Sequence, residues 1–250
     1  MSDYNKRERN YAVRESFKDI FGVWLLKKQS FEGNFDMPVV GCFDDISSID
    51  YLALFSDTAE YRKTENTAVC FYQYDHVFDG IHGLYNSIIY KDERRLAKFR
   101  ERFKNVKWIV APDYSLFGDF PNALQIFNVY RSKICFCWLA SNTEAKIIPN
   151  VRWSFPFTFE YCFDGIVKGS NVAIGIMGLI KRNDNRAMFL EGFRRMVDTI
   201  KPKSILVYGF LTEANIEELL GYAMNKGIRV SAPHSKIDRY KGEDAVYGIR

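Results

Sequence analysis

The sequence is poor in histidine and has no long apolar run. Its three histidines form neither an HxH nor an HxxxH pair, the spacings that bring two imidazoles to one metal ion. No segment reaches the roughly 18 apolar residues that a membrane-spanning helix needs. Charges interrupt the first twenty residues, including Lys18 and Asp19, where a signal peptide has an uninterrupted apolar stretch. We therefore expect a cytoplasmic protein without a membrane partner.

Cysteine is scarce and odd in number. An odd count without paired metal spacing disfavours both a disulfide framework and a zinc site. Cys135 and Cys137 are two residues apart in a predicted helix, so their side chains diverge. We predict five free thiols, as in a reducing cytoplasm; they are Cys42, Cys70, Cys135, Cys137 and Cys162.

Neither sign of charge dominates the chain. The 35 basic and 31 acidic residues give a net charge of +4, which permits an anionic partner without requiring one. With 250 residues, 47% of them hydrophobic, the chain can bury one substantial core, and it has no internal repeat or low-complexity linker. We predict an N-terminal arm over residues 1–30 and a single α/β domain over residues 31–250.

Short runs rich in β-branched and aromatic residues alternate with segments of helical periodicity. This alternation favours a mostly parallel α/β sheet in a barrel-like (β/α) or incomplete barrel arrangement, and an open doubly wound sheet is the alternative. Thr212 is the predicted N-cap of the last helix. The predicted strands are 39–42, 51–55, 68–74, 108–111, 146–148, 172–176, 204–208 and 228–231, and the predicted helices are 92–104, 121–139, 189–200 and 213–226.

Aspartates directly follow two predicted strands. Asp75 comes after 68–74, and Asp113 comes after Pro112 at the end of 108–111. Parallel strands are buried on both faces, so reactive side chains emerge beyond their carboxyl ends. Each aspartate is a candidate for proton transfer, or the two for joint binding of a divalent metal such as Mg²⁺. The alternative is that each accepts backbone N–H groups of its own turn.

Arginines and a tryptophan are candidates for substrate binding. Arg152 and Trp153 follow the predicted strand 146–148, where a guanidinium fits phosphate and an indole stacks on a sugar or base. A structural ion pair between Arg152 and Asp113 fits equally well. Arg131 lies on an apolar predicted helix and must find an anion there, either a ligand or a structural carboxylate.

Three further residues complete the predicted site. Tyr208 ends a predicted strand and is a candidate hydrogen-bond donor in catalysis, with a packed tyrosine as the alternative. Ser115 and Lys168 are candidate substrate-binding residues. The segment DGIVKGS that contains Lys168 is not a phosphate-binding P-loop, because it lacks the GxxxxGK[ST] pattern and precedes a strand.

The strongest basic patch lies on the predicted helix 92–104. Such a patch can follow a phosphate backbone. Interleaved Asp92, Glu93 and Glu101 favour an ordinary solvated face instead. The basic residues are Arg94, Arg95, Lys98, Arg100, Arg102 and Lys104.

Four strings carry a resemblance to a known family: PDYSLFGDFPNALQIFNVYRSK, IIPNVRW, CFDGIVKGS and KPKSILVYG. With them the chain resembles, over about residues 39–209, an uncharacterised phage and mobile-element family, the domain-of-unknown-function family four-four-one-seven. The resemblance implies a phage or mobile-element setting and no assigned chemistry. The family pattern has a histidine and two adjacent aspartates where this chain has Cys70, Tyr74 and Asp75, a departure that weakens a metal role.

Two functions fit these patterns. The first is an enzyme whose pocket at the strand ends acts on a nucleotide, another phosphorylated small molecule or a nucleic acid. The second is a non-catalytic protein that binds a nucleotide, a nucleic acid or a protein partner. A perturbed pKa of Asp113 would favour the enzyme, whereas mutual pairing of the site residues would favour binding or structure. The sequence does not indicate an oligomeric state.

Overall fold

The computed structural model of the chain describes residues 23–178, 183–240 and 248–249. Most of the predicted arm over residues 1–30 therefore lies outside the described residues. The end of this segment forms a 3-10 turn, η2 (Val23–Leu26), whose Leu26 is buried in the main core. An antiparallel hairpin of β1 (Phe31–Glu32) and β2 (Met37–Pro38) follows and leads into the domain.

The first sheet has five strands in the order β10-β3-β4-β5-β6, and every neighbouring pair is parallel. Its central strands are fully buried, as expected for short apolar strands covered on both faces. The bounds are β3 (Tyr51–Leu54), β4 (Thr67–Cys70), β5 (Trp108–Val110), β6 (Lys146–Ile148) and β10 (His234–Ser235).

The second sheet has four strands in the order β11-β9-β8-β7. Strands β7, β8 and β9 are parallel, and β11 pairs antiparallel with β9 at the edge. Every residue of β7 and β8 is buried. The bounds are β7 (Val172–Gly175), β8 (Ser204–Tyr208), β9 (Arg229–Ala232) and β11 (Gly248–Ile249).

The two sheets meet on both sides. Beyond β6, Asn150 forms an isolated parallel bridge with Ala173 of β7, and two backbone hydrogen bonds of 2.9 Å flank it. On the other side Pro233 alone separates β9 from β10, so one stretch of chain reaches both sheets. The predicted α/β class with a mostly parallel sheet is confirmed. Because the ladders are interrupted at both junctions, closure into a barrel is not confirmed, and the five-stranded sheet also fits the open-sheet alternative.

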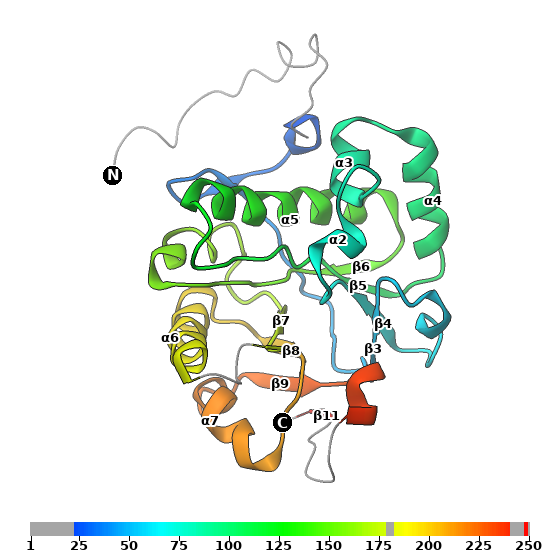
Figure 1. Ribbon diagram of the computed structural model, residues 1–250. Coiled ribbons are helices and arrows are strands. Elements are labelled where there is room, and N and C mark those ends of the chain that lie inside the picture. Colours follow the sequence, from blue (N-terminus) through cyan, green and yellow to red (C-terminus); the bar gives the residue numbers. More distant parts are fainter. Residues whose placement is uncertain (1–22, 179–182, 241–247, 250) are drawn as a thin grey trace.

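Helices cover the outside of both sheets (Figure 1). The helices α3 (Leu84–Ile89), α4 (Glu93–Phe103) and α5 (Asn122–Asn142) lie beside the five-stranded sheet. The other two long helices, α6 (Asn183–Ile200) and α7 (Glu213–Met224), lie beside the four-stranded sheet. Helix α5 is buried without a break from Lys133 to Leu139, which agrees with the apolar sequence of its second half.

Alternating strand residues divide between two cores. One set from both sheets packs together, including Cys70, Val110 and Ile148 from the first and Ala173 and Leu206 from the second. The intervening residues belong to the larger core under the helices. This period of two fixes which side chains leave each strand toward the space between the sheets, and therefore which can share a site at the strand ends.

Local signals located most element ends correctly. Thr212 caps α7 in a capping box with Asn215, as predicted, and Gly227 has a φ of +74° after that helix. The predicted strand 39–42 is wrong, because only Val40 pairs there, in a single bridge to Ile166. Strand 68–74 is shorter than predicted, since β4 ends at Cys70 and the chain turns between Phe71 and Gln73.

Candidate functional site

A buried ion pair lies at the carboxyl ends of β5 and β6. Asp113 follows β5 and Arg152 follows β6, and Arg152 Nη1 lies 3.4 Å from Asp113 Oδ2. The arginine side chain is 18% exposed and the aspartate side chain 11%. Asn150 Nδ2 donates a hydrogen bond of 2.8 Å to the other carboxylate oxygen. The structural alternative that the sequence left open, a pair between Asp113 and Arg152, is thus present.

Two tyrosines extend this pair into a larger group. Tyr72 donates a hydrogen bond of 3.0 Å from its hydroxyl to Asn150 Oδ1, and its ring stacks on Tyr208 with centroids 5.0 Å apart. Gly175, the last residue of β7, makes room for this stack, because a Cβ there would lie 2.6 Å from the Tyr72 ring. We call Tyr72, Asp113, Asn150, Arg152 and Tyr208 the Asp113 group.

The surroundings of Asp113 change its acidity. Burial raises the pKa of its carboxyl, and this effect outweighs the charge of Arg152 and the hydrogen bond from Asn150, which both lower it. The charge of Asp75 adds a smaller increase. A carboxyl that holds its proton more readily is suited to general acid catalysis. Burial also raises the pKa of Tyr208, so its hydroxyl stays protonated and can donate.

Asp75 lies close to this group but binds different partners. It is the first residue of the short helix α2 (Asp75–Phe78). Ser115 Oγ donates to Asp75 Oδ1 at 2.8 Å, and the Ser115 backbone N–H lies 3.2 Å from Oδ2. Asn128 on α5 donates to the Ser115 carbonyl at 2.7 Å. These bonds fix the loop after β5 between α2 and α5.

Arg131 has a structural partner. Its guanidinium pairs with Asp79, with side chains 14% and 11% exposed, and lies 4.0 Å above the ring of Tyr114. A second hydrogen bond of 2.7 Å goes to Asn128 Oδ1. Of the two alternatives for this arginine, the structure contains the structural carboxylate, and Arg131 does not line the cavity beside Arg152.

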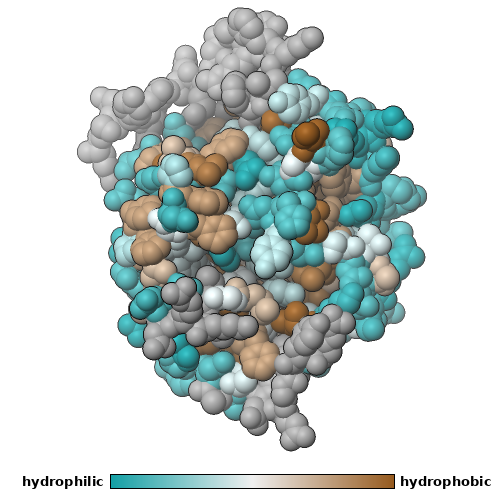
Figure 2. Space-filling model, viewed as in Figure 1, coloured by the Kyte–Doolittle hydropathy of each residue, from teal (hydrophilic) through white to brown (hydrophobic). Residues whose placement is uncertain are grey.

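A cavity of about 250 Å³ opens next to Arg152 at the ends of β6 and β7. Three apolar side chains at its mouth are strongly exposed: Phe117 at 48%, Phe155 at 42% and Met177 at 46%. Figure 2 shows apolar side chains gathered in patches on the viewed face. Among the described lining residues most are apolar and one, Arg152, carries a guanidinium, a combination that is typical of a site for an organic anion. Other lining residues are Leu116, Gly118, Trp153, Ser154, Gly178, Asn185, Met188 and Phe189.

Trp153 packs in the core and also lines the cavity. It is 6% exposed and stacks on Phe189, with ring centroids 5.5 Å apart. Gly192 of α6 faces the indole so closely that a Cβ would lie 2.2 Å from it. The indole is thus held in one orientation, and Trp153 lines the cavity.

Lys168 lies at the other end of the sheet. It precedes β7, whereas Arg152 follows β6, and its neighbour Gly169 binds the carbonyl of Ile200 just before β8. Parallel strands place their amino ends on one edge and their carboxyl ends on the other. The structure therefore does not bring Lys168 to the Asp113 group. The prediction that Lys168 and Arg152 belong to one substrate-binding site is not supported by this placement.

The divalent-metal role of Asp75 and Asp113 stays a prediction. Both oxygens of Asp113 have donors in Asn150 and Arg152, and both oxygens of Asp75 face Ser115. A shared Mg²⁺ ion would have to replace these donors. Across the residues that the structure describes, no group of three or more His, Cys, Asp or Glu side chains is placed to hold a metal ion.

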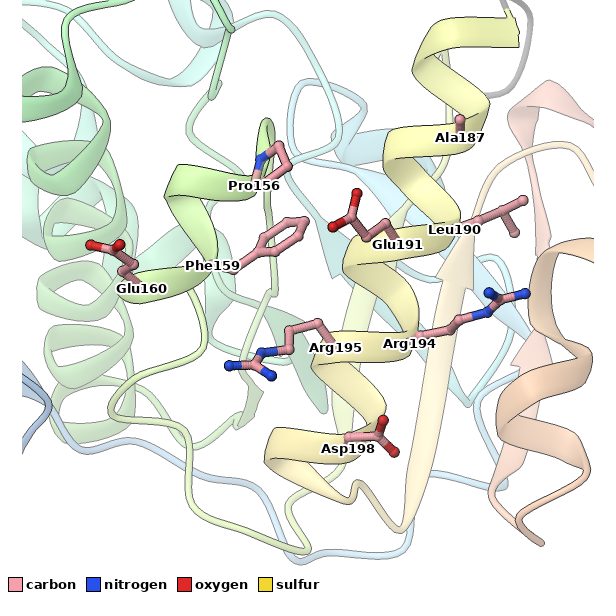
Figure 3. Close-up of a pocket in the computed structure, with 9 residues that line it drawn as sticks. All are labelled: Pro156, Phe159, Glu160, Ala187, Leu190, Glu191, Arg194, Arg195 and Asp198. Atoms are coloured by element: carbon pink, nitrogen blue, oxygen red, sulfur yellow. The ribbon is translucent and has the colours of Figure 1, made fainter.

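A larger hollow, about 680 Å³, lies on the outside of the fold between α6 and the 3-10 turn η4 (Pro156–Glu160). Figure 3 shows Phe159 and Arg195 pointing into it, while Arg194 points away toward α7. Asp198 at its lower end already binds Lys226 and the hydroxyl of Tyr222. None of the predicted site residues lines this hollow, and its charges have both signs.

The basic residues of α4 border an open groove. They face α2 across a hollow of about 990 Å³ whose lining includes Arg94, Arg95, Lys98 and Arg102. Arg95 pairs with Asp92 at 3.0 Å, and Arg100 pairs with Glu93. These pairs agree with the solvated-face alternative, although Arg94 and Lys98 are exposed and free to contact a phosphate backbone.

We predict that reversing Arg94, Arg95 and Lys98 to glutamate leaves small-molecule binding and folding intact. Leu96 and Phe103 hold α4 in the core, and Asp92 caps it through the backbone of residue 95, which the change does not remove. Exposed ion pairs contribute about 0–1 kcal/mol each. Thermal unfolding and nucleic-acid retardation assays test this. A variant that keeps its melting temperature but loses nucleic-acid binding would show that the groove is a functional surface.

Sequence reasoning missed Asn150 and Tyr72. A signal for Asn150 was available, because Pro149 and Asn150 after β6 repeat the arrangement of Pro112 and Asp113 after β5. In the register of β5 and β6, Asn150 lies opposite Pro112, one residue before the level of Asp113, and its amide donates to the Asp113 carboxylate. Tyr72 had no such signal, since its position depends on the early end of β4 and on the space that Gly175 provides.

The fold and the Asp113 group define an α/β protein whose candidate site lies at the carboxyl ends of parallel strands. The chain belongs to the family described as Domain of unknown function (DUF4417), which matches residues 29–225. This confirms the resemblance found in the sequence. No helix within the described residues combines the length and apolarity needed to cross a membrane.

Two phage proteins are similar to this chain. One is the "Gene 1 protein" of Mycobacterium phage L5, 38% identical over 119 residues, which cover 48% of this chain and 52% of that protein. The other is the "Gene 1 protein" of Mycobacterium phage D29, 31% identical over 166 residues, which cover 65% of this chain and 57% of that protein. The chain thus matches little more than half the length of these relatives. No solved structure matches it.

The five cysteines should be unreactive in the folded protein. All are free and buried, and burial raises the pKa of Cys42 and Cys137 to about 11 and that of Cys70 and Cys135 to about 12. Thiolate is the reactive form. We expect Ellman's reagent at pH 8 to detect no thiol in native protein and five after denaturation without reductant. A denatured count of three or one would instead indicate disulfides.

Proposed function

We propose that the chain binds a nucleotide or another phosphorylated small molecule in the cavity beside Arg152. One observation carries this proposal: Arg152 lines the cavity, while its buried Nε atom has no hydrogen-bond partner among the described residues. A guanidinium has five N–H donors in a fixed fork, and the contact with Asp113 is a long one at 3.4 Å. A phosphate group can therefore use the remaining donors.

The walls of the cavity suit the organic part of such a ligand. Trp153, Phe155 and Phe189 supply aromatic surface, and Asn185 and Ser154 supply polar groups. Stacking of a base on an aromatic side chain contributes about 1–3 kcal/mol in nucleic-acid complexes. A flat, partly apolar base joined to a phosphate matches this combination better than inorganic phosphate alone.

Catalysis is the second candidate function, and the acidity of Asp113 favours it. A buried carboxyl with a raised pKa can exchange a proton with a ligand bound to Arg152. Tyr208 would support this chemistry through its stack on Tyr72, which binds Asn150. The mutual pairing of Asp113, Asn150 and Arg152 supports the simpler binding function, which we place first.

The proposal also covers the biological setting of the chain and its alternative binding partner. The phage origin of the similar proteins supports a role in a phage or mobile element. Five free cysteines agree with a reducing compartment such as the cytoplasm. A nucleic acid is the alternative partner, favoured by the exposed basic residues of α4.

Calorimetric titration with a panel of ligands tests the proposed function. The panel contains a nucleoside, its 5′-monophosphate, its 5′-triphosphate and inorganic phosphate, each with Mg²⁺ and with EDTA. We expect the phosphorylated forms to bind at least about tenfold more tightly than the nucleoside, because charge-assisted hydrogen bonds contribute about 1.5–3 kcal/mol. Equal affinity for the nucleoside would contradict the role of Arg152, and binding only with Mg²⁺ would support the metal prediction.

A further inference from the structure

A lysine on α5 is buried without a close partner. Lys133 is 5% exposed and begins the unbroken buried stretch of the helix that continues to Leu139. Within the described residues it forms no hydrogen bond or ion pair, and the carboxylates of Asp164 and Glu32 act on it only at longer range. Burying an ammonium group costs several kcal/mol unless an anion compensates it. This lysine therefore needs an explanation.

Lys133 lines a small chamber in the interior. The chamber has a volume of about 20 Å³, which is enough for one water-sized group. Arg152 lines it as well, so two cationic side chains border the same space. Arg152 and Leu116 also line the larger cavity beside Trp153. The other lining residues are Tyr114, Asn128, Val129, Ser132, Asn150 and Cys162.

We propose that this chamber is an oxyanion subsite, in which Lys133 and Arg152 bind one oxygen of the phosphate group while the rest of the ligand lies in the larger cavity. The inference rests on the proposed function and extends it by one residue and one subsite. The size of the chamber admits a single oxygen atom but not a whole phosphate. Ser132 and Asn150 also line the chamber, and their donors already bind the Pro112 carbonyl and the Asp113 carboxylate, so the two cations are left to bind the oxygen.

The protonation of Lys133 gives this subsite a measurable property. Burial lowers the pKa of its ammonium group to about 8. The groups around it are the carboxyls of Asp164 and Glu32, the thiols of Cys137 and Cys162, and, among the residues that line the chamber, Arg152 and Tyr114. A phosphate oxygen in the chamber favours the charged lysine, so binding should take up a proton near pH 8 and weaken at higher pH.

Titration of wild-type protein and two variants with a nucleoside 5′-monophosphate, at pH 7 and pH 9, tests the subsite. The phosphate is already a dianion across this range, because its second pKa is about 6. We expect wild-type affinity to fall about five- to tenfold at pH 9. Lys133→Met should show the weaker affinity at both pH values with an unchanged or higher melting temperature. Lys168→Met, which removes an exposed lysine at the other edge, should behave as wild type.

Several outcomes would overturn the subsite. Equal binding by Lys133→Met and wild type, with binding still dependent on Arg152, would leave the proposed function intact and exclude Lys133 from the binding site. Should Lys133→Met fail to fold, proton uptake by the wild-type protein, measured in two buffers of different ionisation enthalpy, decides the question alone. Absence of proton uptake at pH 8 contradicts the subsite, and absence of any phosphate binding contradicts both proposals.

Discussion

Replacing Arg152 with methionine should weaken the binding of a nucleoside 5′-monophosphate by roughly ten- to a hundredfold. Hydrogen bonds to a charged group contribute about 1.5–3 kcal/mol, and each 1.4 kcal/mol corresponds to a factor of ten in affinity. Methionine keeps much of the length and apolar packing of the arginine stem. The nucleoside without phosphate should bind the variant as it binds wild type. Calorimetric titration of both ligands measures this difference.

The partner of Arg152 must be considered in that experiment. In the variant Asp113 would lose its nearby cation, and burial already raises the pKa of its carboxyl. We therefore expect Asp113 to take up a proton and to remain buried as a neutral carboxyl. The double variant Arg152→Met with Asp113→Asn removes this complication. Lys168→Met removes one positive charge far from the cavity and serves as the control. Similar losses in the control and in Arg152→Met would point to net charge rather than to a site.

Replacing Asp113 with asparagine should change the pH dependence of stability. The folded pKa of Asp113 is raised above its unfolded value. Its contribution to stability is therefore fully present below the unfolded pKa of 3.8 and is lost as pH rises through the folded pKa. The unfolding free energy of wild type should fall with pH in this window relative to Asp113→Asn. Denaturant unfolding of both proteins from pH 3 to pH 7 measures the difference.

The matched comparison isolates one carboxyl. Burial also raises the pKa of Asp164, but that group is present in both proteins and cancels in the difference. At pH 7 we expect the two unfolding free energies to agree within about 1–2 kcal/mol, since asparagine can still face Asn150 and Arg152. A much larger loss at pH 7 would mean that the charged pair with Arg152 holds the strand ends together and that Asp113 is structural.

The carboxyl-end positions of Asp113 and Arg152 were predictable from sequence. Each follows a short apolar run and a proline, and strands of a parallel sheet end on one edge, so their neighbourhood follows from the strand pattern. The same argument failed for Lys168, because it precedes its strand and belongs to the opposite edge. Whether a basic residue precedes or follows its strand therefore decides whether it can lie near Asp113.

Other features depended on contacts between distant segments. The single bridge at Val40 replaces a predicted strand because its partner is one residue of the loop before β7. The partner of Arg131 is Asp79, 52 residues earlier, and nothing in the local pattern selects it over a ligand. Lys133 was detectable as the one lysine in an apolar helix, but only the packing around it reveals the chamber shared with Arg152.

A crystal soaked with a bromine-substituted nucleoside 5′-monophosphate tests the central claim most directly. The account predicts phosphate density against Arg152, with one oxygen directed toward Lys133, and an anomalous bromine signal beside Trp153 and Phe155. Binding along the basic groove of α4, or in the hollow between η4 and α6, would contradict it.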